Sequence, residues 1–283
     1  MQLARRREQL RPQLAQWRRA GETVALVPTM GALHEGHLAL VRCARTRARR
    51  TVVSIFVNPA QFGPGEDFHR YPRDEAGDLA KLAALGVDLV YLPDAADMYA
   101  PDHRSWVVVE ELSEGLCGAS RPSFFRGVAT VVLKLLLRVR PDLAVFGEKD
   151  YQQLLVVRRM VRDLDLDLEV VAHPVVREPD GLALSSRNAY LSPEERRIAP
   201  ALYRSLCWGR ERLLKGAAAE AVCAAIAARL VEAGFRAVDY VELRDAEGLR
   251  PLSRFDGRPA RLLAAAFLGT TRLIDNLPLS RPA

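Results

Sequence analysis

The first half of the chain alternates short, almost wholly apolar runs with longer segments in which apolar residues recur every three or four positions. Residues 23–27 and 51–57 are rich in β-branched side chains and carry few polar groups. Strands that are apolar on both faces are typical of the middle of a parallel sheet covered by helices. Between these two runs, residues 34–48 place Leu38 and Val41 on one helical stripe. The pattern predicts a strand–helix–strand unit.

The same alternation continues to about residue 176. Residues 78–86 fit a helix with Gly86 just beyond its last turn, and residues 128–139 fit another that Pro141 stops. Further segments follow: a helix at 151–164 and strands at 87–92, 106–111, 142–146 and 168–176. This order of elements predicts the α/β class, with a doubly wound, Rossmann-like parallel sheet.

The remainder of the chain has a different pattern. Ser192 as N-cap, Pro193 at the first helical position and Glu195 two residues later predict a helix start. The segments expected here are a helix over 192–214, an alanine-rich helix over roughly 217–233, strand-like runs at 238–243 and 261–268, and then 271–276. We therefore place a boundary near residue 175. We expect a first domain over 1–175 and a smaller α+β domain over 176–283.

The composition is that of a globular protein with an excess of basic residues. Of 283 residues, 49% are hydrophobic and 27% charged, and 41 Lys and Arg against 35 Asp and Glu give a net charge of +6. Such an excess indicates nucleic acid, a polyanionic small molecule or a solvated helix face. Acidic residues are interspersed among the arginines and no aromatic residues punctuate them, which favours the solvated face. We expect no nucleic-acid partner.

The cysteines and the apolar runs bear on location. Four cysteines stand far apart, with no C-x-x-C and no histidine at metal spacing, which favours reduced thiols in a cytoplasmic protein. The N-terminus has no apolar segment typical of a signal peptide. The longest apolar run, 127–137, contains Lys134 and is too short to span a bilayer. We expect a soluble cytoplasmic protein without a membrane partner.

Residues 28–37, "PTMGALHEGH", connect a predicted strand to the helix predicted after it. Ligands of parallel sheets bind beyond the carboxyl ends of the strands, and the free N–H groups of a first helical turn favour an anion. Gly31 and Gly36 allow phosphate oxygens close to the backbone. His34 and His37 share one face of the turn and can donate to those oxygens. The arrangement predicts a phosphate site rather than a surface turn with incidental histidines.

The pattern His-x-Gly-His at this place resembles the signature of a nucleotidyl-transfer superfamily that contains the class I aminoacyl-tRNA synthetases and small cytidylyl- and adenylyltransferases. Further blocks extend the resemblance along the chain: "SIFVNPAQF" (54–62), "EDFHRYPR" (66–73), "SRPSFFRGVATVVLKLL" (120–136), "GEKDYQQ" (147–153), "DGLALSSRN" (180–188) and "RLIDN" (272–276). Taken together, these blocks resemble the pantoate–β-alanine ligase family over nearly the whole chain.

The resemblance implies an ATP-dependent ligase that joins the carboxylate of pantoate to the amine of β-alanine through a pantoyl-adenylate. The residues expected to bind ATP by this resemblance are Met30, Gly31, Ala32, Leu33, His34, Glu35, Gly36, His37, Gly147, Glu148, Lys149, Asp150, Val176, Leu184, Ser185, Ser186 and Arg187. Among them His37, His34 and Lys149 are the catalytic candidates, which supply positive charge or hydrogen-bond donors. Mg²⁺ is expected on the ATP phosphates, with no protein ligand assigned to it.

The residue types fit these roles. Lys149 can counter phosphate charge, Asp150 can accept from ribose hydroxyls, and residues 184–187 offer two hydroxyls and a guanidinium to the β- and γ-phosphates. Gln61 and Gln153 are expected at pantoate, and Gln61 also at β-alanine, because a neutral amide holds the substrate without competing for its proton. By composition alone each of these residues reads as an ordinary surface or turn residue. Their common placement after strands favours the site.

The chain departs from the usual family pattern at one position, since Ala60 stands where the family commonly has methionine before Gln61. The smaller side chain opens space beside the expected pantoate pocket. The resemblance also implies a homodimer, formed through the first domain, where the apolar segment 105–112 could supply surface.

Two alternative functions stay open from the sequence. A nucleotidyltransferase that stops at the nucleotidyl adduct shares the histidine signature but needs no second amine site. A basic RNA-binding protein is suggested by the arginines, and a steep salt dependence of nucleic-acid retention would support it. No recognised RNA-binding motif accompanies those arginines, so we rank this function last.

Overall fold

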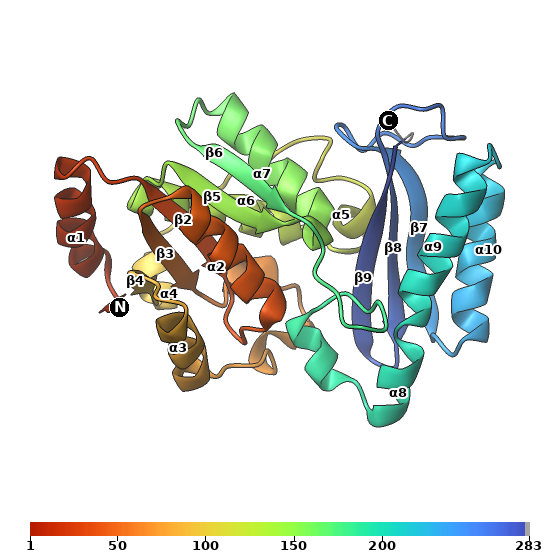
Figure 1. Ribbon diagram of the computed structural model, residues 1–283, viewed down its shortest axis with the longest axis horizontal. Coiled ribbons are helices and arrows are strands. Elements are labelled where there is room, and N and C mark those ends of the chain that lie inside the picture. Colours follow the sequence, from red (N-terminus) through yellow and green to blue (C-terminus); the bar gives the residue numbers. More distant parts are fainter. Residues whose placement is uncertain (281–283) are drawn as a thin grey trace. The chain divides into compact units, whose positions relative to one another are not determined.

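The computed structural model describes residues 1–280, which divide into two compact units. The first comprises Met1–Glu148 and Val156–Pro174, and the second comprises Lys149–Leu155 and the described residues from Val175 onward. Each unit has its own sheet and its own covering helices (Figure 1). The last three residues of the predicted second domain, 281–283, lie outside the described residues.

The sheet of the first unit has six strands, and every neighbouring pair is parallel. The strands are β1 (Gln2–Ala4), β2 (Val24–Thr29), β3 (Arg50–Ile55), β4 (Leu89–Tyr91), β5 (Leu143–Gly147) and β6 (Glu169–His173). They are ordered β1-β4-β3-β2-β5-β6. After β2 the chain adds β3 and β4 on one side of that strand, and it later adds β5 and β6 on the other side. The order reverses between β2 and β5, and ligands of such sheets bind beyond the carboxyl ends at that switch point.

Helices cover both faces of this sheet because its central strands are apolar on both faces. The helices are α1 (Arg7–Arg19), α2 (Glu35–Arg47), α3 (Glu75–Ala84), α4 (Ala95–Met98), α5 (Leu116–Ser120), α6 (Phe124–Val139) and α7 (Tyr151–Asp163), with 3-10 turns η1 (Pro59–Gln61), η2 (Asp67–His69) and η3 (Glu148–Asp150). Ala25 and Val27 of β2 pack in one core cluster with Val41 of α2. Leu26 lies on the opposite face of β2, by strand alternation, and is fully buried there.

Most elements predicted for the first unit are confirmed, one is wrong, and several observed elements were not predicted. The predicted strand over 106–111 is wrong. Trp106 and Val108 are 41% and 62% exposed, and the N–H of Val107 donates to Thr130 Oγ1 (3.0 Å) instead of to a neighbouring strand. The apolar pattern also did not predict the short strand β1 or the helices α1, α4 and α5. Helix α6 ends as expected before Pro141, with Arg140 in the left-handed region at φ 48°.

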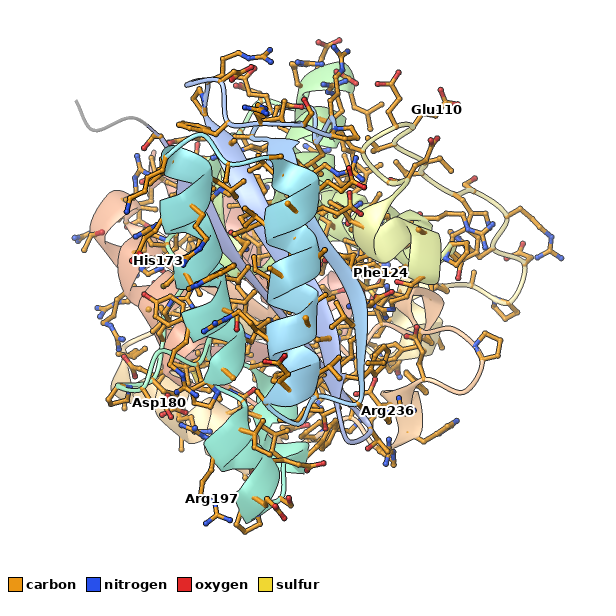
Figure 2. All side chains as sticks on the ribbon, turned by 90° about the vertical axis from the view of Figure 1, so that its right-hand side faces the viewer. Glu110, Phe124, His173, Asp180, Arg197 and Arg236 are labelled. Carbon is orange, nitrogen blue, oxygen red and sulfur yellow. The ribbon has the colours of Figure 1, made fainter. Side chains whose placement is uncertain are left out.

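The second unit is an α+β arrangement around a three-stranded antiparallel sheet of order β7-β8-β9. Its elements are β7 (Ala237–Asp245), β8 (Ala260–Leu268), β9 (Thr271–Leu279), α8 (Pro193–Ile198), α9 (Ala201–Leu214), α10 (Ala219–Glu232) and the turn η4 (Ser186–Tyr190). Helices α9 and α10 lie side by side over one face of the sheet (Figure 2). Leu206 and Ile226 of these helices are fully buried in one cluster with Leu262 of β8. The fold class predicted from the sequence is thereby confirmed.

The helix expected over 192–214 is two helices. Its start is as predicted, because the Ser192 hydroxyl accepts from the N–H of Glu195 and the Glu195 carboxylate accepts from the N–H of Ser192. The break falls at Pro200, which has no N–H to continue the helix. Residues 271–276 belong to β9, which runs on to Leu279.

Within residues 1–280, every helix is too short or too polar to cross a membrane.

Candidate active site

Two histidines begin helix α2 just beyond the carboxyl end of β2. His34 is the N-cap, and its Nδ1 accepts from the N–H of Gly36 (3.1 Å). The N–H of His34 in turn donates to Nδ1 of His37 (3.4 Å), and the two ring centroids lie 4.1 Å apart. A backbone N–H can only donate, so Nδ1 of each ring is an acceptor and the proton of each neutral ring is assigned to Nε2. Each ring of the pair therefore carries its proton on Nε2, at the N-terminus of a helix.

Helix α3 holds the loop that leads to these histidines. The buried carboxylate of Asp78 accepts from the N–H of Leu33 (2.7 Å), and Lys81 Nζ donates to the Leu33 carbonyl (2.8 Å). Burial raises the pKa of Asp78 above its ordinary value, against the opposing effect of the Leu33 N–H. Gly31 and Ala32 take φ of 80° and 48°, and a Cβ on Gly31 would come within 3.1 Å of Asp78 Oδ2. The carboxylate thus fixes a loop with left-handed backbone.

Gln61 ends the turn η1, and its neighbours orient its side-chain amide. Asn58 accepts from the N–H of Ala60 at Oδ1 (3.3 Å) and donates from Nδ2 to the Gly127 carbonyl (3.1 Å). These two backbone groups leave one orientation for the Asn58 amide, whose Nδ2 also donates to Gln61 Oε1 (3.0 Å). Nε2 of Gln61 then lies 3.0 Å from Met30 Sδ. Gln61 is therefore turned to donate, and it contacts the first of the candidate ATP residues.

Further contacts support this turn. Tyr99 donates from its hydroxyl to Asn58 Oδ1 (2.8 Å), and burial raises the pKa of Tyr99 to about 12. Arg121 donates to the carbonyl of Gln61 (3.1 Å) and pairs through its fork with the carboxylate of Glu66 (2.7 and 2.6 Å). The backbone and the side chain of Gln61 are thus both held from neighbouring elements.

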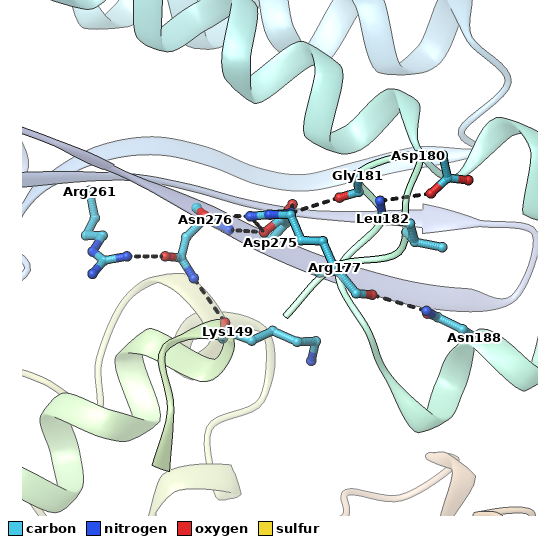
Figure 3. Close-up of polar contacts among 10 residues, drawn as sticks. Lys149, Arg177, Asp180, Gly181, Leu182, Asn188, Arg261, Asp275 and Asn276 are labelled. Atoms are coloured by element: carbon cyan, nitrogen blue, oxygen red, sulfur yellow. Dashed lines mark hydrogen bonds and ion pairs between the residues drawn. The ribbon is translucent and has the colours of Figure 1, made fainter. Parts of the chain in front are cut away.

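Lys149 and Asp150 follow β5 and belong to the second unit, while Gly147 and Glu148 belong to the first. Lys149 Nζ lies 3.5 Å from Asp150 Oδ2. The carbonyl of Lys149 accepts from Nδ2 of Asn276 in β9 (3.1 Å; Figure 3). The predicted Gln153 is half-buried in the first turn of α7.

A small hairpin in the second unit joins two of the candidate ATP segments. The N–H of Leu184 donates to the carbonyl of Val176 (3.0 Å), and Glu178 donates to Leu182 (2.8 Å). A turn closes the hairpin where Gly181, at φ 94°, donates to the carbonyl of Glu178 (2.9 Å). Val176 and Leu184, eight residues apart in sequence, therefore lie side by side.

The candidate residues that follow Leu184 form a capped turn. Ser185 is the N-cap of η4, and its Oγ accepts from the N–H of Arg187 (3.3 Å). Asn188 anchors the turn by donating from Nδ2 to the carbonyl of Ala183 (3.1 Å). Ser186 and Arg187 are half-buried on this turn. A hydroxyl and a guanidinium are thus presented at the start of a short helical turn, a place that suits anions.

The candidate residues are distributed over the two units. Those in the first unit are Met30, Gly31, Ala32, Leu33, His34, Glu35, Gly36, His37, Gln61, Gly147 and Glu148, and those in the second are Lys149, Asp150, Gln153, Val176, Leu184, Ser185, Ser186 and Arg187. Within the first unit, residues 30–37 and Gln61 are brought together by the contact with Met30. Within the second, Val176 and Leu184 are brought together by the hairpin.

The sequence did not single out several residues that hold these groups. They are Asp78, Lys81 and Tyr99 in the first unit, and Arg177, Asp275 and Asn276 in the second. One signal was available for Asp78, a carboxylate one turn before the buried Leu82 of the same helix. Asp275 and Asn276 carried a similar signal, since they stand between the apolar residues Ile274 and Leu277 of β9.

Comparison with known proteins identifies the family. A sequence model described as "Pantoate-beta-alanine ligase" matches residues 2–278. Pantothenate synthetase from Rhodospirillum rubrum is 56% identical over 275 residues, which cover 97% of this chain and 98% of that protein. The similarity therefore extends over both units.

Solved structures give the same result. The crystal structure of pantothenate synthetase from Thermus thermophilus matches with a TM-score of 0.91 and 50% identity, covering 98% of this chain and 99% of that one. A pantoate-beta-alanine ligase from Francisella tularensis, solved in complex with beta-gamma ATP and beta-alanine, matches with a TM-score of 0.81 and 31% identity, covering 98% and 97%.

Proposed function

Because the chain belongs to the pantoate-beta-alanine ligase family, we propose that it condenses pantoate with β-alanine at the expense of ATP. The products are pantothenate, AMP and pyrophosphate, and the intermediate is a pantoyl-adenylate. The observation that carries the proposal for this chain is the pair of histidines that caps α2 at the switch point of a parallel sheet. A helix N-terminus with two added N–H donors is suited to a nucleotide phosphate.

The first step forms the adenylate. A carboxylate oxygen of pantoate attacks the α-phosphorus of ATP, and the bond to the bridging oxygen breaks so that pyrophosphate leaves. Nε2–H groups of His34 and His37 donate to phosphate oxygens, and Lys149 adds positive charge as negative charge develops. Catalysis of this step rests on positioning and on preorganised charge stabilisation.

The second step forms the amide. The neutral amine of β-alanine attacks the acyl carbon of the adenylate, AMP leaves with the electrons of the acyl–oxygen bond, and the amine nitrogen loses its proton. Gln61 is turned to donate through Nε2, so we assign it to oxygen atoms of pantoate and to the carboxylate of β-alanine. Gln153 is assigned to pantoate from the second unit.

We assign ATP to the residues predicted from the sequence, from Met30 to His37, from Gly147 to Asp150, and in the second unit to Val176 and to Leu184 through Arg187. Two features support the assignment. Loop 30–34 is held in place by Asp78 and Lys81, and the hairpin sets Val176 against Leu184. Binding sites that are held before the ligand arrives lose less entropy on binding.

Magnesium would arrive with ATP. Residues 1–280 contain no group of three His, Cys, Asp or Glu side chains placed to hold a metal ion. Mg²⁺ commonly keeps several waters and takes phosphate oxygens in place of a protein cage. When bound there, the ion would neutralise phosphate charge, and no protein ligand is assigned to it.

We also propose a homodimer, a cytoplasmic location and a division of labour between the domains. The partly exposed Trp106 and Val108 supply apolar surface to a dimer. The four cysteines are free thiols, which suits a reducing compartment. We propose that residues 1–175 form the nucleotide- and pantoate-binding domain and that the smaller domain, 176–283, covers the ATP site.

Isotope exchange tests the proposed chemistry. Labelled pyrophosphate should exchange into ATP when pantoate is present and β-alanine is absent, because the adenylate forms before the amine is needed. Addition of β-alanine should then release AMP and pantothenate in equal amounts. Exchange that requires β-alanine would contradict the adenylate, and an adduct that resists β-alanine would favour a nucleotidyltransferase.

A further inference from the structure

Segment 272–276 carries part of the family resemblance, yet the proposed chemistry assigns it no role. Its last two residues, Asp275 and Asn276, are only 3% and 2% exposed within β9. Buried polar side chains are costly unless they are hydrogen-bonded. Two of them in succession within a strand therefore need partners on both faces of the sheet.

Strand alternation directs these two side chains to opposite faces. Asp275 shares a face with Leu273 and Leu277, which belong to the core cluster under α9 and α10. Asn276 lies on the other face, directly paired with Leu263 of β8. Each residue therefore reaches a different segment of the second unit.

Asp275 holds the hairpin of the candidate ATP site. Its carboxylate accepts two bonds from the guanidinium of Arg177 (2.6 and 2.9 Å), and Arg177 also donates to the carbonyl of Gly181 (3.0 Å; Figure 3). The same guanidinium stacks 4.1 Å above the ring of Tyr203, and a Cβ on Gly181 would come within 2.2 Å of that ring. Through Arg177, the buried carboxylate of Asp275 thereby holds both the first strand of the hairpin and its turn at Gly181.

Asn276 holds the turn that carries Lys149. Its Nδ2 donates to the Lys149 carbonyl (3.1 Å), while its Oδ1 accepts from Arg261 (2.9 Å). Arg261 stacks 4.0 Å above the ring of Tyr151, two residues beyond Lys149, and the Tyr151 hydroxyl donates to the carbonyl of Ala246 (2.8 Å). The contacts close a ring from Asn276 through Arg261 and Tyr151 back to Lys149.

We propose that Asp275 and Asn276 are positioning residues that fix the two ATP-binding segments of this unit relative to each other. The inference rests on the proposed function, which assigns Lys149 and residues 184–187 to the phosphates of ATP. The lysine ammonium sits on a flexible four-carbon stem, so its reach depends on where the backbone of Lys149 is anchored. A displacement of about 1 Å in such a group can lower a rate about 100-fold.

Asn276→Asp tests the Lys149 arm. The variant keeps the size of the side chain and the acceptor for Arg261, but it turns a carboxylate oxygen toward the Lys149 carbonyl where Nδ2 had donated. We expect kcat for pantoate-dependent pyrophosphate release to fall about 10-fold to 100-fold, with KM for pantoate unchanged. In a Lys149→Ala background the same substitution should lower kcat no further, because residues that act through one another are not additive.

Arg177→Lys tests the hairpin arm. Asp275→Asn would leave the half-buried guanidinium of Arg177 facing a neutral amide and could unfold the protein. The lysine variant is used instead, because it keeps the charge and loses only the fork. We expect KM for ATP to rise about 10-fold and KM for pantoate to stay constant. An equal rise in KM for ATP and for pantoate would overturn the proposed role of Asp275 in positioning the hairpin.

Asp239→Asn is the matched control. It breaks an ion pair of the same sheet, between Asp239 and Arg272 of β9 (2.6 Å). Arg272 lies four residues before Asn276 in the same strand. Asp239→Asn should lower Tm and leave kcat unchanged. An equal loss of kcat in the control would overturn the proposal. If the losses of kcat in Asn276→Asp and Lys149→Ala add up in the double variant, the inference is overturned and the proposed function still stands. Normal exchange in Lys149→Ala alone would overturn the role of Lys149 and the inference with it.

Discussion

His34 combines two tasks that are usually separate. Helix N-caps are most often Ser, Thr, Asp or Asn, whose side-chain oxygen accepts from the first turn. Here an imidazole Nδ1 accepts instead, from Gly36. The ring is thereby oriented and its remaining N–H is kept on Nε2, where it can donate to a phosphate. The side chain of His34 is therefore both the N-cap of α2 and a candidate catalytic donor.

This dual role gives a prediction for His34. His34→Asn should keep a capping oxygen and therefore keep stability, while it removes the Nε2–H donor and lowers kcat on the order of 100-fold. His34→Ala should lower kcat equally and also destabilise the protein by about 1 kcal/mol. Steady-state kinetics and thermal unfolding separate the two effects.

His37→Ala is the companion test. It removes the Nε2–H donor of His37 itself. It also removes the acceptor for the backbone N–H of His34, so the orientation of His34 changes as well. We expect a loss of kcat at least as large as that of His34→Asn. A folded double variant of both histidines that turns over at a near-normal rate would contradict their catalytic role.

At the level of single residues, the histidines could be predicted because their spacing and their place after a strand are visible in the sequence. The orientation of the Gln61 amide could not be predicted. It depends on the carbonyl of Gly127 and on Tyr99, which are far from Asn58 in the chain and meet it only in the folded unit. The role of Asp78 in holding the loop could not be predicted for the same reason, because its partner Leu33 is 45 residues away in the chain.

Among the elements, α6 and η1 approach so closely that only glycine fits between them. A Cβ on Gly127 would lie 2.2 Å from the carbonyl oxygen of Ala60 and 2.8 Å from the backbone nitrogen of Gln61. The position of the turn that carries Gln61 therefore depends on the absence of one methyl group.

Gly127→Ala should displace η1. We expect KM for pantoate to rise about 10-fold, KM for ATP to change much less, and the free energy of unfolding to fall by about 1–3 kcal/mol, the usual range for an added methyl in a packed interior. Gly63→Ala is the control, because the nearest atom to its added Cβ would be Glu66 Oε1 at 3.5 Å, an ordinary van der Waals contact. Kinetics normal in both variants would show that the turn is not rigidly held.

Element boundaries were predictable where the sequence contains a stop or a cap. Pro141 and the box of Ser192 with Glu195 gave correct ends, because these signals act within one turn of helix. The strand expected over 106–111 failed, because an apolar, β-branched run becomes a strand only if a partner strand is available. Val107 donates to a threonine hydroxyl of α6 instead.

At the scale of the whole molecule, the exposed apolar residues at 106 and 108 bear on assembly. If this surface forms the proposed dimer, Val108→Asp should shift the mass measured by light scattering from twice to once the 31.4 kDa of one chain. The substitution lies at a 62% exposed position and should not unfold the subunit. A wild-type protein that is monomeric at micromolar concentration would refute the dimer.

The class of the fold could be predicted as a whole because apolar strands alternating with amphipathic helices have few ways to bury their surfaces. The order of the strands could not, since nothing local in β2 specifies that β5 will be its second neighbour. That pairing joins Ala25 to Leu143 across more than a hundred residues of chain.

The pairing of β2 with β5 also bears on how the protein acquires its activity. Loops that close over so long a stretch form slowly, because their entropy is lost before the contacts are gained. Helix α2 can assemble locally against β2 and β3 well before β5 arrives. Residues 30–37 would then be in place before residues 149–187 have been synthesised. We therefore expect the proposed activity to appear only in the second half of synthesis, after all the candidate ATP segments have emerged.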